Sequence, residues 1–373
     1  MRRETIAGGP GDFMTVRHLT VRGTQEEIGR ALAEEAREAY GWAPVAADPR
    51  MGRARRDWFA REWPRQAARL RGAARAAGLD PDRTDVHLDG LTRPPDGSGC
   101  SAAWCPPGLL GRNYDFFTIG WAQMFALMTG ATPPAHETPM ASRPYVVTSR
   151  PDDGPATVVL TMDTLDGCME GVNEHGLAVV LLLADAESAA PPVEAGPQVG
   201  LNQVQLPRYV LDTCATAEEA RRALLGAKQY DLGSPMHYVI ADATGDAFVW
   251  ERTTAGVEHV IDADGPLCLT NHPLHRHPDP ARLPADTEAS MRTYGRAATL
   301  SARTREALMD GKGLRAALDE VGFDAAAAGP MPLRTLWRTV FDLDARTLAV
   351  RFYLGDDADG APRYGDEQEF GAG

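Results

Sequence analysis

The stretch GCSAAWCPPGLLGRNYD, residues 99–115, is the part of the sequence around which the rest can be organised. A segment rich in Gly, Ser and Pro precedes Cys100. A short turn and a few apolar residues follow it. Arg112, Asn113 and Asp115 then place three polar side chains within four residues, at the end of an expected strand. Three polar side chains so close together indicate a functional site rather than a core segment.

Cys100 gains a second chemical function if the peptide bond between Gly99 and Cys100 is cut. As a new N-terminal residue it carries both a thiol nucleophile and an α-amine, so that one residue supplies a nucleophile and its base. An α-amine titrates near about 7.7–8.0, close to neutral pH, whereas a lysine amine near about 10.4 stays mostly protonated. The bond before Cys100 is therefore a candidate site of self-cleavage.

The composition argues against several classes of function. The chain has 373 residues and a formal net charge of -14, which disfavours binding to nucleic acid or to an anionic membrane through the overall field. No apolar run reaches the length of a membrane span. A secretory signal is not recognisable and the cysteines form no CxxC pair, so reduced thiols and a cytoplasmic location are expected. The five cysteines are Cys100, Cys105, Cys168, Cys214 and Cys268.

The first 99 residues are predicted to be mainly helical. Thr24 and Glu27 form a capping-box pattern at the start of a helix over residues 25–40. A second helical region over residues 52–78 kinks or restarts at Pro64. Residues 1–15 are expected to be a loose tail.

Strand-like runs dominate after Cys100, and turn residues separate several of them. Helices are expected between the runs, at about 202–225 and 286–310. Strands joined by tight turns, with helices grouped apart, favour an α+β antiparallel architecture. The expected organisation is a helical N-terminal segment over 1–99, one domain over 100–355 and an acidic flexible tail over 356–373.

Four motifs, in their order along the chain, resemble those of one protein family. They are GC at 99–100, GRNYD at 111–115, GVNEHGL at 171–177 and LTNHP at 269–273. The chain resembles the cysteine N-terminal-nucleophile hydrolases of the acyl-CoA:6-aminopenicillanate acyltransferase family (peptidase C45-like), which are related to choloylglycine hydrolases and penicillin V acylases. The resemblance runs from about residue 16 to residue 355. It implies an αββα sandwich with a helical pro-segment over 1–99 and the catalytic domain over 100–355.

The resemblance also implies an activity. By this resemblance the chain would be a precursor that cuts itself between Gly99 and Cys100. The fragments, of 99 and 274 residues, would stay associated. Cys100 would be the nucleophile and its α-amine the general base in an amidase or acyltransferase. The substrate would be a small linear amide or an acyl-thioester of the acyl-CoA type, and no cofactor is implied. Whether water or an amine accepts the acyl group is left open.

Further site residues are carried over from the family motifs. Arg112 would favour the thiolate, Asp115 would accept a hydrogen bond from the α-ammonium, and the Asn271 amide would donate to the oxyanion. A late-helix arginine corresponds to Arg296 or, as the alternative, Arg292. One position departs from the bile-salt hydrolase branch: Leu183 stands where that branch has a second Asn. The departure and the long N-terminal segment favour the acyltransferase branch.

The segment after the motif suggests where an acyl group binds. Tyr114, Phe117, Trp121 and Phe125 are candidates for the wall of an acyl pocket, although core packing is the ordinary interpretation of apolar residues at helical spacing.

Each site residue also has a purely structural interpretation. Cys100 can be a buried structural thiol, Arg112 and Asp115 an ion pair, and Asn271 a turn residue. The alternative function is then an uncleaved, non-catalytic binding or scaffold protein. A metal-dependent hydrolase is a more distant alternative, and no metal site is expected because the spacing fits no ligand pattern. The residues in question are His272, His275, His277 and Asp279.

Overall fold

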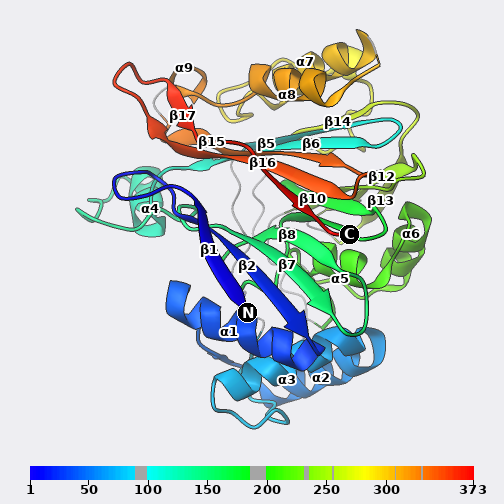
Figure 1. The fold of residues 1–373 in the computed structure, drawn as a ribbon. Coiled ribbons are helices and arrows are strands. Elements are labelled where there is room, and N and C mark those ends of the chain that lie inside the picture. Colours follow the sequence, from blue (N-terminus) through cyan, green and yellow to red (C-terminus); the bar gives the residue numbers. More distant parts are fainter. Residues whose placement is uncertain (89–98, 185–198, 231–234, 254–255, 307, 329–330) are drawn as a thin grey trace.

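Two β-sheets pack face to face in the centre of the molecule, and helices cover both outer faces (Figure 1). The computed structural model describes residues 1–88, 99–184, 199–230, 235–253, 256–306, 308–328 and 331–373. The layer order is therefore helix, sheet, sheet, helix, which confirms the predicted αββα sandwich.

The larger sheet has nine strands, and its neighbours pair in the order β1-β2-β7-β8-β9-β10-β11-β12-β13. Strand β2 pairs with β7 in parallel, and the other neighbours pair antiparallel. The strands are β1 (Arg2–Ala7), β2 (Val16–Gly23), β7 (Tyr145–Pro151), β8 (Thr157–Thr161), β9 (Glu170–Asn173), β10 (Ala178–Leu183), β11 (Met236–Ala241), β12 (Ala247–Arg252) and β13 (Glu258–Asp262).

The smaller sheet has seven strands in the order β14-β5-β6-β15-β16-β17, and β18 also pairs with β16. They are β5 (Gly99–Cys105), β6 (Leu109–Phe117), β14 (Leu267–Leu269), β15 (Leu333–Asp342), β16 (Thr347–Asp356), β17 (Pro362–Tyr364) and β18 (Gln368–Gly371). A separate two-stranded ribbon joins β3 (Val45–Ala46) to β4 (Val86–His87).

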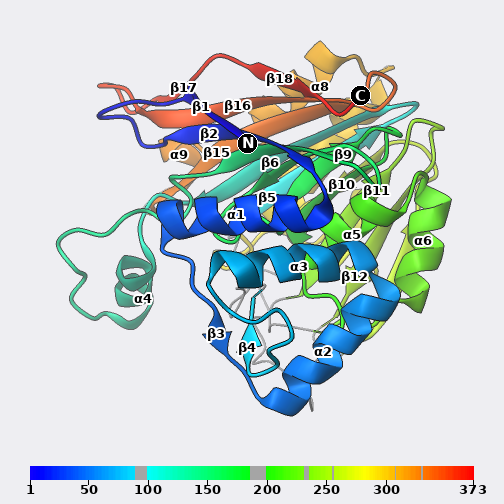
Figure 2. The same cartoon turned by 60° about the horizontal axis from the view of Figure 1, so that its bottom comes forward.

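The helices form two groups and one outlier (Figures 1 and 2). Those outside the larger sheet are α1 (Gln25–Tyr40), α2 (Pro49–Glu62), α3 (Pro64–Ala76), α5 (Gln205–Thr213) and α6 (Ala217–Gly226). Those outside the smaller sheet are α7 (Thr293–Glu306), α8 (Gly311–Glu320) and α9 (Ala325–Ala328), with a short 3-10 turn, η1 (Pro280–Arg282), before them. Helix α4 (Trp121–Thr129) projects from one end of the molecule. Within the described ranges no helix is both long and apolar enough to cross a membrane.

The main core lies between the two sheets, because alternate side chains of each strand point inward. Val158, Val180 and Val239 from the larger sheet meet Phe341 and Phe352 from the smaller one in a single buried cluster. The opposite strand faces bury against the two helical layers. Side chains that face inward near the strand ends are therefore held between two rigid sheets.

The N-terminal helices form as the sequence predicts. Thr24 caps α1 with a capping box that includes Glu27, and the helix ends at Gly41 with φ 71°. The second helical region is two helices, because Pro64 ends α2 and starts α3.

Two segments expected to be loose are instead strands. Residues 2–7 form β1, which pairs with β2 at the edge of the larger sheet. The C-terminal residues form β17 and β18, which both pair with β16. The prediction of a flexible tail after Gly355 is therefore wrong, because backbone pairing with a neighbouring sheet edge outweighs the polar composition of the segment.

Candidate active site

Cys100 is the second residue of β5, opposite Tyr114 on β6. Its side chain belongs to the core between the sheets and is 1% exposed. Nη2 of Arg112 lies 3.6 Å from its Sγ atom and donates to it. Burial raises the pKa of the Cys100 thiol above its ordinary value, and the charge of Arg112 acts in the opposite direction. The thiol of the uncleaved chain therefore stays protonated at neutral pH.

Arg112 spans the space between the two sheets. It projects from β6 toward Glu170 on β9, and its Nη1 donates to Oε1 of Glu170 at 2.8 Å, with both side chains at most 1% exposed. Glu170 also accepts from Trp337 Nε1 and, at 2.7 Å, from the Thr339 hydroxyl. A buried charge pair needs such extra partners to offset its loss of hydration, and here they fix the guanidinium beside the Cys100 thiol.

Asn271 and Arg296 hold the backbone of Cys100. The Cys100 N–H donates to Oδ1 of Asn271 at 2.7 Å, and Nη1 of Arg296 donates to the Cys100 carbonyl at 2.7 Å. Nη2 of Arg296 also donates to Oδ1 of Asn271, at 2.8 Å. Nδ2 of Asn271 donates to the Leu183 carbonyl at 3.0 Å, so the position where a second Asn was missing supplies a backbone acceptor.

Asp115 lies on β6 opposite Gly99, with its side chain toward α7. Its Oδ1 accepts from the Thr335 hydroxyl at 2.6 Å, and its Oδ2 lies 3.6 Å from Nη1 of Arg296. Within the described residues Oδ2 has no hydrogen-bond partner. Burial is the largest effect and raises the pKa of the Asp115 carboxyl to about 6.

The structure distinguishes between the two candidate arginines of the late helix. Arg296 contacts the backbone of Cys100, as described above, whereas the Arg292 guanidinium lies 5.6 Å from the centre of the Phe323 ring. Five predicted residues therefore come together in one buried cluster: Cys100, Arg112, Asp115, Asn271 and Arg296.

The four residues proposed for the acyl pocket do not share one environment. Tyr114 and Phe117 belong to the buried core between the sheets. Trp121 and Phe125 lie on α4 and are 38% and 63% exposed. The first two therefore lie in the core and the other two on a helix at one end of the molecule (Figure 2), and a shared acyl pocket stays a prediction.

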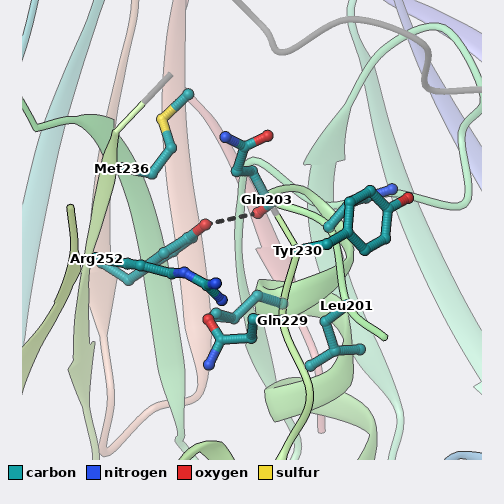
Figure 3. A pocket seen from close by; sticks show the side chains of 9 residues that line it. Leu201, Gln203, Gln229, Tyr230, Met236 and Arg252 are labelled. Atoms are coloured by element: carbon teal, nitrogen blue, oxygen red, sulfur yellow. Dashed lines mark hydrogen bonds between the residues drawn. The ribbon is translucent and has the colours of Figure 1, made fainter. Parts of the chain in front are cut away.

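A pocket on the outer face of the larger sheet is too small for a substrate (Figure 3). It has a volume of about 20 Å³ and lies beside the start of α5 and strands β11 and β12. Such a volume holds about one water molecule. Tyr238, one of its lining residues, donates to the Gln203 carbonyl at 3.0 Å. Met236 and Tyr238 point to this outer face of β11, so the pocket lies on the side away from the core between the sheets.

The histidines proposed for the distant metal alternative lie in two groups, since His272 and His277 both pack against Tyr294 whereas His275 does not. Nδ1 of His272 lies 3.1 Å from the Thr270 hydroxyl, whereas His275 contacts the Glu251 carboxylate. The His277 ring meets the edge of Tyr294. Across the described ranges no group of three or more His, Cys, Asp or Glu is arranged to hold a metal ion.

Glu170 and Thr335 are site residues that the sequence analysis missed. Glu170 begins β9 and pairs with Leu160 and Val180, two apolar inward-facing residues. A single carboxylate in such an apolar strand position needs a buried cation, and this is the signal by which it could have been found. Thr335 carries no comparable signal, because threonine is common in strands.

A model of the family "acyl-coenzyme A:6-aminopenicillanic acid acyl-transferase" matches residues 104–358, which is more than half of the chain. No curated protein sequence gives a significant match.

Solved structures give weak overall similarity. A conjugated bile acid hydrolase mutant from Clostridium perfringens is 15% identical, with a TM-score of 0.47, over 72% of this chain and 92% of that chain. A penicillin V acylase from Agrobacterium tumefaciens is 19% identical, with a TM-score of 0.43, over 71% and 84%. A Caenorhabditis elegans orthologue of N-acylethanolamine-hydrolyzing acid amidase is 15% identical, with a TM-score of 0.38, over 66% and 92%.

Proposed function

Because the chain belongs to the acyl-coenzyme A:6-aminopenicillanic acid acyl-transferase family, we propose that it is a self-processing cysteine amidase or acyltransferase that works through a thioester on Cys100. The observation that carries the proposal is the set of contacts on this one buried residue. Arg112 lies on its thiol, Asn271 on its backbone N–H and Arg296 on its carbonyl. A structural cysteine needs none of these polar partners.

The first reaction is cleavage of the chain. Sγ of Cys100 attacks the carbonyl carbon of Gly99 and forms a thioester, while the C–N bond breaks and the Cys100 nitrogen takes the thiol proton to become the α-amine. Water then attacks the thioester, which releases Gly99 as a carboxylate and returns the thiol to Cys100. The products are fragments 1–99 and 100–373, held together by the fold.

The second reaction is turnover of a small acyl amide or acyl-thioester. The α-amine of Cys100 takes the thiol proton, and the sulfur attacks the substrate carbonyl. The leaving amine or thiol departs with that proton, and the acyl group stays on Cys100 as a thioester. Water or an amine then attacks the thioester, with the α-amine again as base. A base positioned in this way accelerates a reaction by roughly 10²–10⁴-fold.

The neighbouring residues have separate roles in this scheme. Arg112 favours the thiolate and is itself held by Glu170. Asp115 accepts a hydrogen bond from the new α-ammonium through its Oδ2, which has no hydrogen-bond partner among the described residues. Asn271 keeps its Oδ1 on the Cys100 nitrogen and uses a free Nδ2 hydrogen for the oxyanion, because only one of the two hydrogens is needed for Leu183.

Intact-mass spectrometry of the purified protein mixed with an N-acyl amine, or with an acyl-thioester and an amine, tests the proposal. The expected result is a mass increase of one acyl group on the 274-residue fragment, which hydroxylamine removes. The ratio of free acid to transferred product then distinguishes amidase from acyltransferase. The absence of an acyl adduct, together with failure of iodoacetamide to modify Cys100 in the folded protein, would instead support the non-catalytic scaffold.

A further inference from the structure

Glu251 is a buried carboxylate that the proposed reaction does not use directly. It lies on β12, opposite His237 on β11 and His259 on β13, and is 1% exposed. His237 is inward-facing, since its pairing partner on β10, Leu182, belongs to the core between the sheets. Glu251 therefore points toward the same interior as Cys100, from the opposite sheet.

Four donors converge on this carboxylate. Oε2 accepts from the Leu274 N–H at 2.7 Å and lies 3.1 Å from Nδ1 of His237. Oε1 accepts from the His275 N–H at 3.3 Å and from Nδ1 of the same residue. The His259 ring stacks on His275, with ring centres 3.9 Å apart. One carboxylate thus fixes two histidines and two consecutive backbone N–H groups.

The donors around Glu251 keep its carboxylate ionised at neutral pH. Burial by itself raises the pKa of Glu251, but the hydrogen bonds from His237, His275 and Leu274 outweigh it and bring the pKa to about 2. An ionised carboxylate can only accept hydrogen bonds, so both imidazoles present an Nδ1–H to it. The Nε2 atom of His237 is left without a partner among the described residues.

The backbone that Glu251 holds leads directly to Asn271. Leu274 and His275 follow Asn271 by three and four residues, and Leu274 is buried in the core between the sheets. On the other side, the Asn271 N–H donates to the hydroxyl of Thr293, the first residue of α7, at 2.8 Å. Asn271 is therefore held between α7 on the smaller sheet and Glu251 on the larger sheet.

We propose that Glu251 is a positioning residue, which fixes the 272–275 loop so that the Asn271 side chain meets the Cys100 nitrogen and the reacting carbonyl. The inference rests on the proposed function and adds a residue to it. A misplacement of about 1 Å at a reacting group can lower a rate by about 10²-fold. Loss of the Glu251 charge should therefore act on the chemical steps that use Asn271 and not on the thiol itself.

The test is Glu251→Gln in the full chain. Glutamine has the same shape, and its side-chain oxygen can still accept from the Leu274 N–H. Its NH₂ group is a donor, however, and would face the two donors of His275. The expected result is slower self-cleavage and a kcat lower by about 10- to 100-fold, with little change in KM. Alkylation of Cys100 by iodoacetamide uses the thiolate but no oxyanion donor, so its rate should stay within about twofold of wild type. Mass spectrometry of the 274-residue fragment measures the acylation and the alkylation of Cys100, and it does so on the cleaved form alone.

Two further variants separate positioning from simple loss of stability. Glu251→Asp keeps the charge but sets it back by one methylene, and its kcat should lie between those of Glu251→Gln and wild type. Asp212→Asn removes another buried carboxylate, which pairs with Arg69 and Arg208 on the outer side of the larger sheet. It should lower stability and leave kcat of the folded enzyme unchanged. If Glu251→Gln does not fold, Glu251→Asp carries the test.

Three results would overturn the inference. Wild-type kcat and cleavage in Glu251→Gln, or in Glu251→Asp where that variant carries the test, would show that Asn271 is positioned without the carboxylate. If kcat and the rate of Cys100 alkylation fell by the same factor, and stability fell with them, Glu251 would be a structural residue only. A wild-type protein that neither cleaves nor turns over would remove the proposed function itself, and the first two results are distinguishable from it because they require an active wild type.

Discussion

Asp115 links the site to pH at the scale of single residues. Its pKa is raised to about 6 by burial, whereas an unfolded Asp titrates near about 3.9. Between these values the folded state holds more protons than the unfolded state, so stability falls as pH rises. The contribution of Asp115 is complete below about pH 4 and is lost as pH rises through about 6.

We predict that Asp115→Asn, made in the uncleaved Cys100→Ala protein, removes the decrease in stability with rising pH that Asp115 causes. The amide is neutral at every pH, so the free energy of unfolding should lose the part of its pH dependence between about 4 and 6 that Asp115 causes, up to roughly 3 kcal/mol. Urea unfolding at a series of pH values measures it. Parallel pH profiles for the two proteins would contradict a raised pKa.

Glu170 supports a second prediction at this scale. Glu170→Gln leaves the buried charge of Arg112 without its carboxylate, and removal of one partner of a buried pair typically costs about 3–5 kcal/mol. Chemical denaturation should show a loss of that order. As a control, Glu34→Gln breaks only the exposed pair with Arg30 and should change stability by about 0.5 kcal/mol at most. Equal effects of both variants would mean that Glu170 does not balance Arg112.

At the scale of elements, the N-terminal helices pack with their backbones in close contact. A Cβ atom built on Gly72 of α3 would lie 2.0 Å from the Glu26 carbonyl oxygen and 2.6 Å from the Arg30 nitrogen of α1. A glycine at this crossing lets α1 and α3 approach each other. The same helix carries Arg69, which pairs with Asp166 and Asp212 in the other proposed fragment.

We predict that Gly72→Ala forces α1 and α3 apart and lowers stability by about 1–3 kcal/mol, the usual cost of overpacking. Gly226→Ala is the matched control, because a Cβ atom at Gly226 meets nothing within 4 Å. Thermal unfolding should show a lower midpoint for the first variant only. Equal midpoints would indicate that the helices separate without cost.

Helical periodicity and capping chemistry were sufficient to predict these elements, but sheet pairing was not. The capping box at Thr24 and the break at Pro64 act over a few residues, so they can be recognised locally. Strands β1 and β18 are defined by partners far along the chain or at a sheet edge. Their sequences are polar because one face is exposed, and no local pattern distinguishes them from a loose tail.

The candidate site was likewise predicted only in part. The motif residues Cys100, Arg112, Asp115 and Asn271 are found as a cluster, with Arg296 rather than Arg292 beside them. Glu170 and Glu251 were not predicted, because their role depends on strands that face the motif from the opposite sheet. The exposure of Trp121 could not be predicted either, because the direction of α4 cannot be deduced from its periodicity.

At the scale of the whole molecule, residues 1–88 are built into the body of the protein. They supply β1 and β2 of the larger sheet, where residues 17–23 of β2 pair with β7, and they supply helices α1 to α3 on its outer face (Figure 1). Cleavage before Cys100 therefore leaves two chains that share one sheet. The fragments should remain together in native buffer and separate only when the protein is denatured.

Mass spectrometry of wild type beside Cys100→Ala is the most direct test of self-cleavage, run once under denaturing conditions and once after native gel filtration. The account predicts two wild-type fragments, residues 1–99 and 100–373, that elute together in native buffer at the size of the whole chain. The variant should give one intact chain of 373 residues. One intact chain in both proteins would contradict the central claim, because the α-amine that serves as base would never form.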